Sequence, residues 1–526
     1  MVLALVLSGC GGGASSGSNA GGGAQLISAR VKDAVGLDPA NETDGLSLNI
    51  TSEVFENLVS FKPGTFDVVP QIATSWTSSA DGKNWTFRLR PGLKFSDGTR
   101  LDAKAVKFNF DRWRLTKNKY HGSLSYPYWA SQFGGFDGKS VVADVLAPAP
   151  DRVTMRLRTP LGPFLRNLAM PSFAIASPDA LMKDPQGFHL KPVSSGPYEI
   201  AEWVKDDHIT LVANPNWDGG TVAYSTVIMR DIPDQSSSVL SMKKGDIDML
   251  IDPRPDDAKD LAQQKGVTLY RQPSNNLTYL ALNMDKKPFD NVLVRRAIGY
   301  AIDKAAIAKS FYALGAQVAD NWTPPGMLGE NSAIKAYPHD AAQARKLLAQ
   351  AGLPNGFATE LFYPTSPRPY MPEPQRMAEA VQANLREIGV TVTLQPYEFG
   401  IFLQKVRNGE HPMCLIGWTG DNGDPDNFMY DILDQDSAVK GQAQNYTFWR
   451  DPAFHTLMLA GQQTLDEKKR AAIYRQANAM IHEQAPAIPI AHSIVSFAAK
   501  SNIDGVIPRP DSIQSYELMK PKATAP

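Results

Sequence analysis

The stretch MCLIGWTGDNGDPDN, residues 413–427, joins a short apolar run to a loop that is rich in carboxylates. Residues 413–416 are all apolar and predict a buried strand. Gly, Pro, Asn and Asp favour loops, and they make up most of residues 417–427, which include Asp421, Asp424 and Asp426. We therefore expect a carboxylate cluster at the end of a core strand, next to a tryptophan. Such a cluster suits a cation, either a metal ion or an ammonium group.

A calcium loop of the EF-hand type is the metal alternative for this cluster. That loop needs Gly at its sixth position and Glu at its twelfth. Counting from Asp421, those positions hold Asp426 and Ile432. The sequence also has no CxxC or Cys/His zinc pattern. We predict no metal and no other cofactor, and we expect Asp424 and Asp426 to set the geometry of the loop.

The composition is typical of a globular protein with more than one domain. The 526 residues suffice for several domains of about 100–200 residues each. The net charge of −1 gives no bulk attraction to nucleic acid or to anionic membranes. No nucleophile elbow, HExxH, P-loop or dinucleotide-binding motif stands at a predicted strand–helix junction. We therefore predict a protein that binds neither nucleic acid nor a cofactor and is not an enzyme.

The first 24 residues differ from the rest of the chain. Residues 1–7 are apolar, and Leu-Ser-Gly-Cys follows at 7–10. This pattern resembles the lipobox of a bacterial lipoprotein signal, which is cleaved before the cysteine that becomes lipidated. It predicts a signal remnant at residues 1–10, with Cys10 as the lipidation site. Gly, Ser and Ala dominate residues 11–24, which is typical of a flexible linker.

From residue 25 onward the chain alternates strand-like and helical patterns, which indicates an α/β architecture. The clearest helical spacing places Val294, Ala297, Ile298 and Ala301 on one face. The predicted helices are 48–58, 103–114, 291–311, 372–388 and 464–481. The predicted strands are 85–89, 153–157, 209–212, 391–394 and 503–507.

Five blocks of the sequence are distinctive when they are taken together. They are DGKNWTFRLRPGLKFSDGTRLDAKAVKFNFDR at 81–112, PVSSGPYEI at 192–200, LNMDKKPFDNVLVRRAIGYAIDK at 282–304, RPY at 368–370 and GWTGDNGDPDNF at 417–428. These blocks resemble family 5 of the extracytoplasmic solute-binding proteins of ABC importers, the peptide and nickel type. The last two blocks look most like its dipeptide-binding branch. The resemblance extends from about residue 25 to the C-terminus.

The resemblance implies a two-lobed periplasmic-binding-protein fold of class II, with an extra subdomain in lobe I. The ligand would be enclosed in the cleft between the lobes. Applied to this chain, the expected boundaries are 25–278 for lobe I with its extra subdomain at about 63–195, 279–492 for lobe II, and 493–526 for a segment that returns to lobe I.

The resemblance also implies roles for individual residues. Asp421 matches the family's aspartate for the peptide ammonium, although from spacing alone it could equally cap or turn the loop. Arg368 matches the family's arginine for the peptide carboxylate, which its planar fork can hold bidentately. Without the match, Arg368 would read as a solvated loop residue. The other expected ligand-binding residues are Gly417 and Thr419 through their backbones, and the aromatic walls Trp418, Tyr370 and Tyr120.

The expected function is that of a monomeric, lipid-anchored, extracytoplasmic binding protein that delivers short peptides, above all dipeptides, to a membrane ABC permease. Two hypotheses compete with it. One is a different cargo on the same fold, such as an oligopeptide, haem, glutathione or a nickel chelate. The other is a sensor or chaperone that passes ligand occupancy to a partner protein.

Overall fold

The computed structural model describes residues 24–523 apart from residues 274 and 313. Within this part of the chain, no helix is long and apolar enough to cross a membrane. The predicted signal remnant and linker lie outside the described residues, except that Ala24 already begins the first strand. The lipidation of Cys10 therefore stays a prediction.

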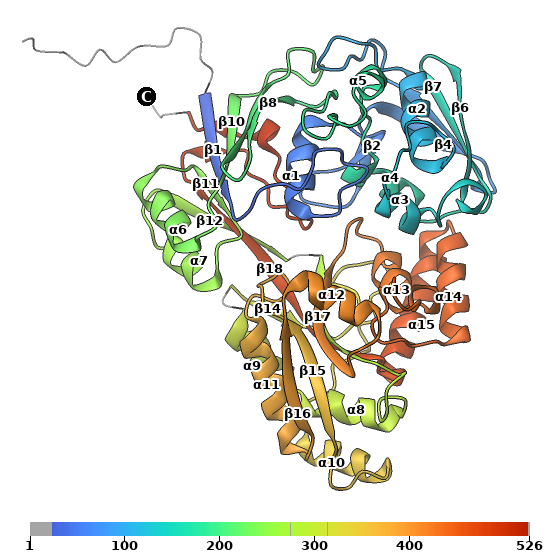
Figure 1. Cartoon of the computed structure of the whole chain (residues 1–526), viewed down its shortest axis with the longest axis vertical. Helices are drawn as coiled ribbons and strands as arrows, with labels where there is room; N and C mark the ends of the chain where they lie inside the picture. The colour runs from blue at the N-terminus through green and yellow to red at the C-terminus, as the bar shows by residue number, and fades with distance from the viewer. Residues whose placement is uncertain (1–23, 274, 313, 524–526) are drawn as a thin grey trace, which may run out of the picture.

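Two lobes share one twelve-stranded mixed sheet, and strand β18 (Ala487–Lys500) runs through both of them (Figure 1). The first part of β18 pairs with β13 (Asn276–Leu282) in one lobe, and the last part pairs with β12 (Val267–Pro273) in the other. The chain therefore passes between the lobes twice, once between β12 and β13 and once within β18. The boundaries expected from the sequence put these passages at 278–279 and 492–493.

Lobe II is a sheet with helices packed against it. Its sheet order is β16-β15-β17-β13-β18, and β14 also pairs with β18. The further strands are β14 (Ala316–Val318), β15 (Ala358–Pro364), β16 (Thr391–Tyr397) and β17 (Met413–Thr419). The helices are α8 (Val292–Ala301), α9 (Lys304–Phe311), α10 (Ala341–Gln350), α11 (Pro374–Glu387), α12 (Phe399–Arg407), α13 (Asp426–Leu433), α14 (Pro452–Gln463) and α15 (Glu467–Gln484), with the 3₁₀ turn η3 (Gln435–Ser437).

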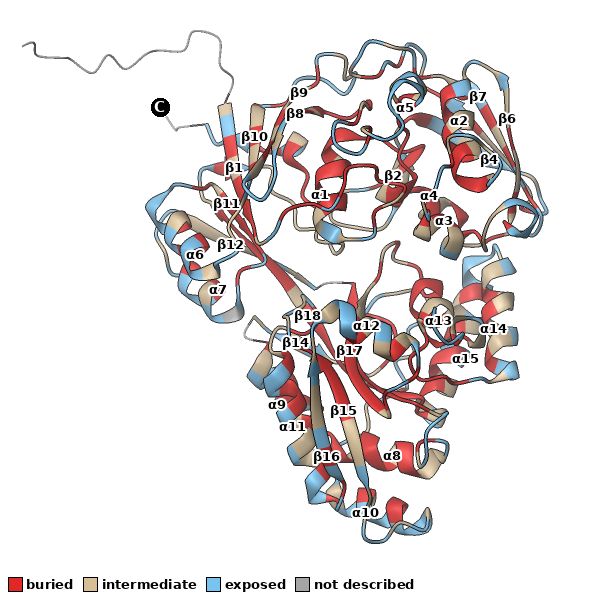
Figure 2. Cartoon of the chain, in the orientation of Figure 1, coloured by how far each residue is buried: buried red, intermediate tan, exposed pale blue. Residues whose placement is uncertain are grey.

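Strand β17 is buried on both faces of this sheet. Met413 and Leu415 belong to one hydrophobic cluster, and Cys414 and Ile416 belong to another. Successive side chains of a strand point to opposite faces, so a strand covered on both sides needs a continuous apolar run. This is why residues 413–416 are all apolar, and it confirms the predicted buried strand. Figure 2 shows β17 mostly in the colour of buried residues, whereas the edge strand β16 also carries exposed ones.

Lobe I carries the other half of the shared sheet, in the order β18-β11-β1-β10-β9-β8. Its strands are β1 (Ala24–Arg30), β8 (Tyr198–Val204), β9 (His208–Ala213), β10 (Tyr224–Asp231) and β11 (Met249–Ile251). Its helices are α1 (Gly45–Val54), α6 (Gln235–Lys244), α7 (Pro255–Leu261) and the 3₁₀ turn η4 (Tyr516–Leu518). The C-terminal segment 503–507 does not join this sheet, because β19 (Ile503–Asp504) pairs only with β20 (Lys520–Pro521) in the described ladders.

A second, antiparallel sheet forms a separate layer at the far end of lobe I, in the order β4-β5-β7-β6 (Figure 1). It has its own hydrophobic core, which contains Trp113, Trp129 and Phe173. Its strands are β4 (Ala73–Ser78), β5 (Asn84–Leu89), β6 (Val142–Ala149) and β7 (Arg152–Leu157), and the hairpin β2 (Val59–Phe61) and β3 (Val68–Pro70) lies beside it. Its helices are α2 (Ala103–Arg114), α3 (Pro127–Gln132), α4 (Phe164–Leu168), α5 (Pro178–Lys183) and the 3₁₀ turns η1 (Asp137–Lys139) and η2 (Pro171–Phe173).

The structure confirms several predicted elements and corrects others. Helix α2 matches the predicted helix 103–114, because Asp102 caps its start by accepting from the backbone amides of Lys104 and Ala105. The predicted helix 48–58 is wrong at both ends. Helix α1 is capped by Asp44 and stops at Val54, after which Phe55 is extended.

Two longer helix predictions are also wrong in their limits. The predicted helix 291–311 is divided into α8 and α9, because the extended Ile302 ends the first helix and Asp303 caps the second. The predicted start at Thr464 is three residues too early. Thr464 ends α14, and Asp466 caps α15 by accepting from the amide of Lys469.

Candidate functional site

Strand β17 presents an open edge at its C-terminal end. It pairs with β13 along its whole length, from Met413 to Thr419. On its other side, β15 pairs only with Met413 and Cys414 in the described ladders. The end that contains Gly417, Trp418 and Thr419 therefore has backbone groups facing a side without a strand partner. An extended ligand can use such groups as a neighbouring strand would.

Tyr370 is fixed against Gly417. A Cβ atom on Gly417 would lie 2.3 Å from Cδ2 of Tyr370 and 2.5 Å from the carbonyl oxygen of Leu277, so only glycine fits. Tyr370 is buried, and its carbonyl accepts hydrogen bonds from the hydroxyls of Tyr312, at 2.8 Å, and Thr278. These contacts attach the RPY turn to the open end of β17.

Arg368 lies at the start of that turn, where Glu398 acts on its charge without forming an ion pair. Its backbone exchanges two hydrogen bonds with Met371, at 3.0 and 2.8 Å, which closes the turn. Its guanidinium lies over the ring of Phe399, 3.4 Å from the ring centre. Among the described residues it has no carboxylate partner in an ion pair, and its Nε is buried without a hydrogen bond. Burial lowers the pKa of Arg368, because the charged form loses water.

Asp421 stands in the loop that follows β17. Its Oδ1 accepts from the hydroxyl of Tyr128 at 2.6 Å, and its Oδ2 accepts from Nδ2 of Asn427 at 3.1 Å. Burial raises the pKa of Asp421 to about 6, and the two hydrogen bonds oppose that shift. No cationic side chain of the described chain pairs with it. Asp421 is thus an anion that the protein leaves without a counterion.

Tyr128 was not among the residues singled out from the sequence. It belongs to α3 in lobe I, whereas Asp421 belongs to lobe II, so their hydrogen bond joins the two lobes. The segment that holds Tyr128 also holds Tyr120, which was singled out. Tyr120 packs on Phe108, with ring centres 5.3 Å apart, and under the ammonium of Lys119. In the described chain, no hydrogen bond, ion pair or ring contact joins Tyr120 to β17 or its loop.

Trp418 and Thr419 complete the open end of β17. Nε1 of Trp418 donates to Oδ1 of Asn427 at 3.0 Å, and the same oxygen accepts from the backbone amide of Asp421. Asn427 therefore holds both the tryptophan and the aspartate in place. Thr419 lies opposite Asn276 in the β13–β17 register.

Asp424 and Asp426 have partners within the protein. Nη1 and Nη2 of Arg470 donate to Oδ2 and Oδ1 of Asp424, respectively, each at 2.9 Å. Asp426 accepts from Nε2 of Gln462 at 3.0 Å, and its backbone amide donates to Asp424. Both aspartates shape and anchor the loop, as expected from the sequence.

One group of side chains elsewhere in the described chain could hold a metal ion. Asp434, Asp436 and His455 offer ligand atoms that lie within 4.8 Å of one another. Nδ1 of His455 already contacts Oδ1 of Asp434 at 2.9 Å. None of these residues touches the open end of β17.

Further contacts close the lobes over the carboxylate loop. Nδ2 of the buried Asn422 donates to Oδ1 of Asn167 at 2.8 Å. Nε2 of Gln132 donates to Oδ2 of Asp431 at 3.1 Å. A Cβ atom on Gly423 would lie 2.3 Å from the ring of Phe66, so the loop packs directly on lobe I. Figure 1 shows α3 and α4 of lobe I facing α13 of lobe II.

Two lobes joined by shared strands, with a charged loop enclosed between them, define a solute-binding protein. The chain belongs to the bacterial extracellular solute-binding proteins of family 5, whose model matches residues 67–439. This family consists of transport proteins rather than enzymes.

Individual relatives cover nearly the whole chain. The dipeptide-binding protein of Escherichia coli K12 is 36% identical over 496 residues, 92% of each chain. Heme-binding protein A of Haemophilus influenzae is 31% identical and covers 92% of this chain and 90% of its own. The solved periplasmic binding protein DppA of Helicobacter pylori, in complex with the peptide STSA, is 32% identical with a TM-score of 0.84, over 95% of this chain and 98% of its own.

Proposed function

We propose that this protein captures short peptides, above all dipeptides, between its lobes and delivers them to a membrane ABC permease. It acts as a monomer that is tethered to the outer face of the membrane by a lipid on Cys10. The Escherichia coli relative is named for dipeptide binding, which supports this cargo. Relatives in Pseudomonas aeruginosa named di/tripeptide-binding proteins, at 30–35% identity, support it further.

The observation that carries the proposal is a pair of opposite charges, neither of which has an ion-pair partner among the described residues. Arg368 lies in the turn whose Tyr370 packs on Gly417, and Asp421 lies in the loop that follows the same strand. A peptide is a zwitterion, so its carboxylate compensates Arg368 and its ammonium compensates Asp421. Charge-assisted contacts of this kind are strong where water is excluded.

The open end of β17 supplies the remaining interactions. The backbone groups of Gly417 and Thr419 bond the peptide's own amide, while Trp418 and Tyr370 form walls that tolerate different side chains. Tyr120 would add a further aromatic wall from lobe I. Because both peptide termini are bound, the site selects ligands by length rather than by sequence.

Closure of the lobes couples binding to transport. A peptide that contacts both lobes stabilises the closed form through contacts that the open form cannot make. The hydrogen bond from Tyr128 to Asp421 brings a lobe I hydroxyl to the carboxylate that we propose binds the ammonium. The permease then recognises the closed form.

Haem is the alternative cargo that a relative favours, since Heme-binding protein A is 31% identical. Haem needs an axial ligand such as a histidine. Nε2 of the buried His411 contacts the carbonyl of Tyr446 at 2.8 Å, and Nδ1 of the buried His492 contacts the carbonyl of Asn276 at 2.6 Å. Both side chains are buried, at 0% and 5% exposed, so neither imidazole is accessible to a haem, and the charges of Arg368 and Asp421 favour a zwitterion.

Calorimetry of the purified protein against a dipeptide, a tripeptide, haem and a nickel chelate tests the proposal. The dipeptide should bind most tightly. A dipeptide that fails to bind while a longer peptide or haem binds would overturn the proposed cargo. If the protein binds a dipeptide but dipeptide uptake is the same with and without the cognate permease, a sensor or chaperone role is favoured.

A further inference from the structure

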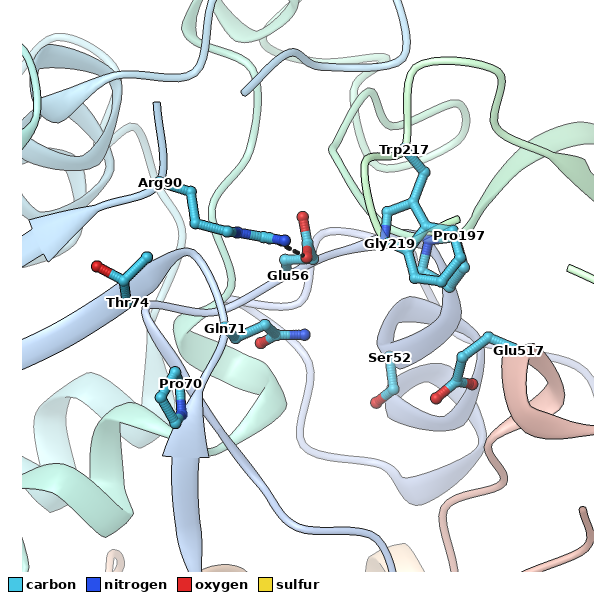
Figure 3. A pocket seen from close by; sticks show the side chains of 10 residues that line it. All are labelled: Ser52, Glu56, Pro70, Gln71, Thr74, Arg90, Pro197, Trp217, Gly219 and Glu517. Atoms are coloured by element: carbon cyan, nitrogen blue, oxygen red, sulfur yellow. Dashed lines mark hydrogen bonds and ion pairs between the residues drawn. The ribbon is translucent and has the colours of Figure 1, made fainter. Parts of the chain in front are cut away.

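A cavity of about 330 Å³ lies in lobe I, away from the cleft between the lobes. It opens where α1, η4 and the segments just before β8 and just after β9 meet the edge of the antiparallel sheet (Figure 3). Every lining residue comes from lobe I or from the C-terminal segment, and none comes from lobe II. Junctions between structural units are common places for small-molecule sites. The cavity is therefore separate from Arg368 and Asp421.

One wall of the cavity is the indole of Trp217. A Cβ atom on Gly219 would lie 2.2 Å from Cζ2 of Trp217, so the glycine allows the indole to fold back over the chain. Figure 3 shows Trp217 on one side of the cavity, with Glu517 reaching in from η4 toward Ser52. An aromatic face near carboxylates attracts organic cations through its quadrupole.

The cationic side chain of the cavity, Arg90, is paired with two carboxylates, while its Nε is buried without a hydrogen-bond partner in the described chain. Nη2 of Arg90 donates to Oε1 of Glu56 at 2.9 Å, and Nη1 contacts Oδ1 of Asp218 at 2.9 Å. Arg90 is therefore flanked by two carboxylates and has little charge left for an anion. Oε2 of Glu56 is buried and has no hydrogen-bond partner in the described chain, on a side chain that is only 5% exposed.

The carboxylates outnumber the cations around this cavity. Glu517 has the buried Glu53 as its neighbour, and Oε2 of Glu53 also lacks a partner among the described residues. The charge of Arg509 acts on both glutamates, and Arg509 is itself paired with Asp511 at 2.7 Å. Burial raises the pKa of both glutamates, and for Glu53 the charge of Glu517 adds to that rise. Of the side chains that line the cavity, Glu56 and Glu517 are carboxylates and Arg90 is the cation.

We propose that this cavity is a second ligand site, which binds a small organic cation of the ammonium or guanidinium class. The cation stacks on Trp217 and is compensated by Glu517 and by the carboxylates around Arg90. A bare metal ion fits poorly, because it needs several oxygen ligands at short distance and gains nothing from an indole wall. The site is independent of the peptide site, so either can fail without the other.

Calorimetry with choline and with agmatine as probes tests this proposal on the full protein. The neutral alcohol 3,3-dimethylbutan-1-ol has the shape of choline without its charge and serves as the ligand control. At least one cation should bind with a dissociation constant of about 1 mM or tighter, and the alcohol should not, because the attraction is electrostatic. Absence of cation binding, or equal binding of the alcohol, would overturn the proposal.

Variants assign the binding to this cavity. Glu517→Gln and Trp217→Leu should each weaken cation binding by about fivefold or more, whereas Trp217→Phe, which keeps an aromatic face, should stay within about twofold of wild type. Asp421→Ala should leave cation binding unchanged while it weakens peptide binding. Cation binding that is lost in Asp421→Ala, or retained in Glu517→Gln, would contradict the assignment. Glu517→Gln keeps the shape of the wild-type side chain. If Trp217→Leu fails to fold, Glu517→Gln alone tests whether the cation binds in this cavity.

Discussion

Asp421 illustrates how one buried carboxylate can control ligand binding through its protonation. A peptide ammonium requires its ionised form, and burial raises its pKa to about 6 in the free protein. Dipeptide affinity should therefore fall as the pH decreases through 6, by up to about tenfold per pH unit, with release of a proton on binding. Calorimetry between about pH 5 and pH 8 in two buffers measures both effects.

The matched control for this prediction is Asp421→Asn, which keeps the shape but cannot titrate. It should bind weakly at every pH and lose most of the pH dependence. Asp431, whose pKa burial raises to about 7, remains as a smaller contribution. Equal wild-type affinities at the two ends of the pH range would contradict the role of Asp421.

The same shift has the opposite consequence for folding. The pKa of Asp421 in the folded protein lies above its ordinary value of 3.8. Its contribution to stability is therefore fully present below that ordinary value and is lost as the pH rises through 6. A bound peptide ammonium removes this cost, so a dipeptide should stabilise the protein more at neutral than at acidic pH.

Arg470 and Asp424 form a buried ion pair whose loss we expect to be costly. Their side chains are only 4% and 1% exposed. Arg470→Met leaves the buried carboxylate of Asp424 without its ion-pair partner, so the free energy of unfolding should fall by about 3–5 kcal/mol. Urea unfolding measures this change. The exposed Lys468, which lies in the same helix, provides the control Lys468→Met, and equal stability of the two variants would refute the prediction.

At the scale of elements, Gly417 decides the shape of the open end of β17. Gly417→Ala places a methyl group against the ring of Tyr370 and the carbonyl of Leu277. The ring and a backbone atom must both shift, at a cost of about 1–3 kcal/mol of stability. Dipeptide affinity should fall as well, because Arg368 lies in the same turn as Tyr370.

Thermal unfolding and calorimetry measure the two effects of Gly417→Ala. The control is Gly45→Ala, because an added Cβ at Gly45 meets nothing within 4 Å. It should change neither stability nor affinity appreciably. A Gly417→Ala protein with wild-type affinity would show that the turn carrying Arg368 does not depend on this contact.

Elements with a strong local pattern were predictable from the sequence. Strand 413–416 and helix 103–114 are predictable because the sequence pattern of each lies within a few consecutive residues. Helix 291–311 was predicted as one element because its apolar spacing continues, whereas the structure divides it at Ile302 and Asp303. Local periodicity does not show where a polar side chain captures a backbone amide and restarts a helix.

The candidate site was predictable only in part. Asp421 and Arg368 came from the resemblance of their motifs to a family, and the structure adds that neither has a counterion in the described chain. Tyr128 could not be found in this way. Its hydrogen bond to Asp421 spans 293 residues and exists only because two lobes meet. Nothing in the local sequence around Tyr128 reports that contact.

At the scale of the whole molecule, polar contacts between the lobes help to set the closed state. Gln132→Ala removes the hydrogen bond that lobe I donates to Asp431. One such bond contributes about 0.5–1.5 kcal/mol, so dipeptide affinity should fall by about two- to tenfold. The change should appear mainly as faster dissociation.

Stopped-flow dissociation of a fluorescent dipeptide measures this effect. The exposed Gln186, also in lobe I, provides the control Gln186→Ala. That variant should release the peptide at the wild-type rate. A Gln132→Ala protein with an unchanged dissociation rate would mean that this contact does not stabilise the ligand-bound form.

The central claim is that Arg368 and Asp421 bind the two charged ends of one peptide. Calorimetry with one dipeptide and its N-acetylated and C-amidated forms, on wild type, Asp421→Ala and Arg368→Ala, tests it most directly. Each variant should lose more than ~1.5 kcal/mol of binding free energy for the free dipeptide. Asp421→Ala should no longer distinguish the acetylated form, and Arg368→Ala should no longer distinguish the amidated form. Wild-type affinity in either variant would contradict the account.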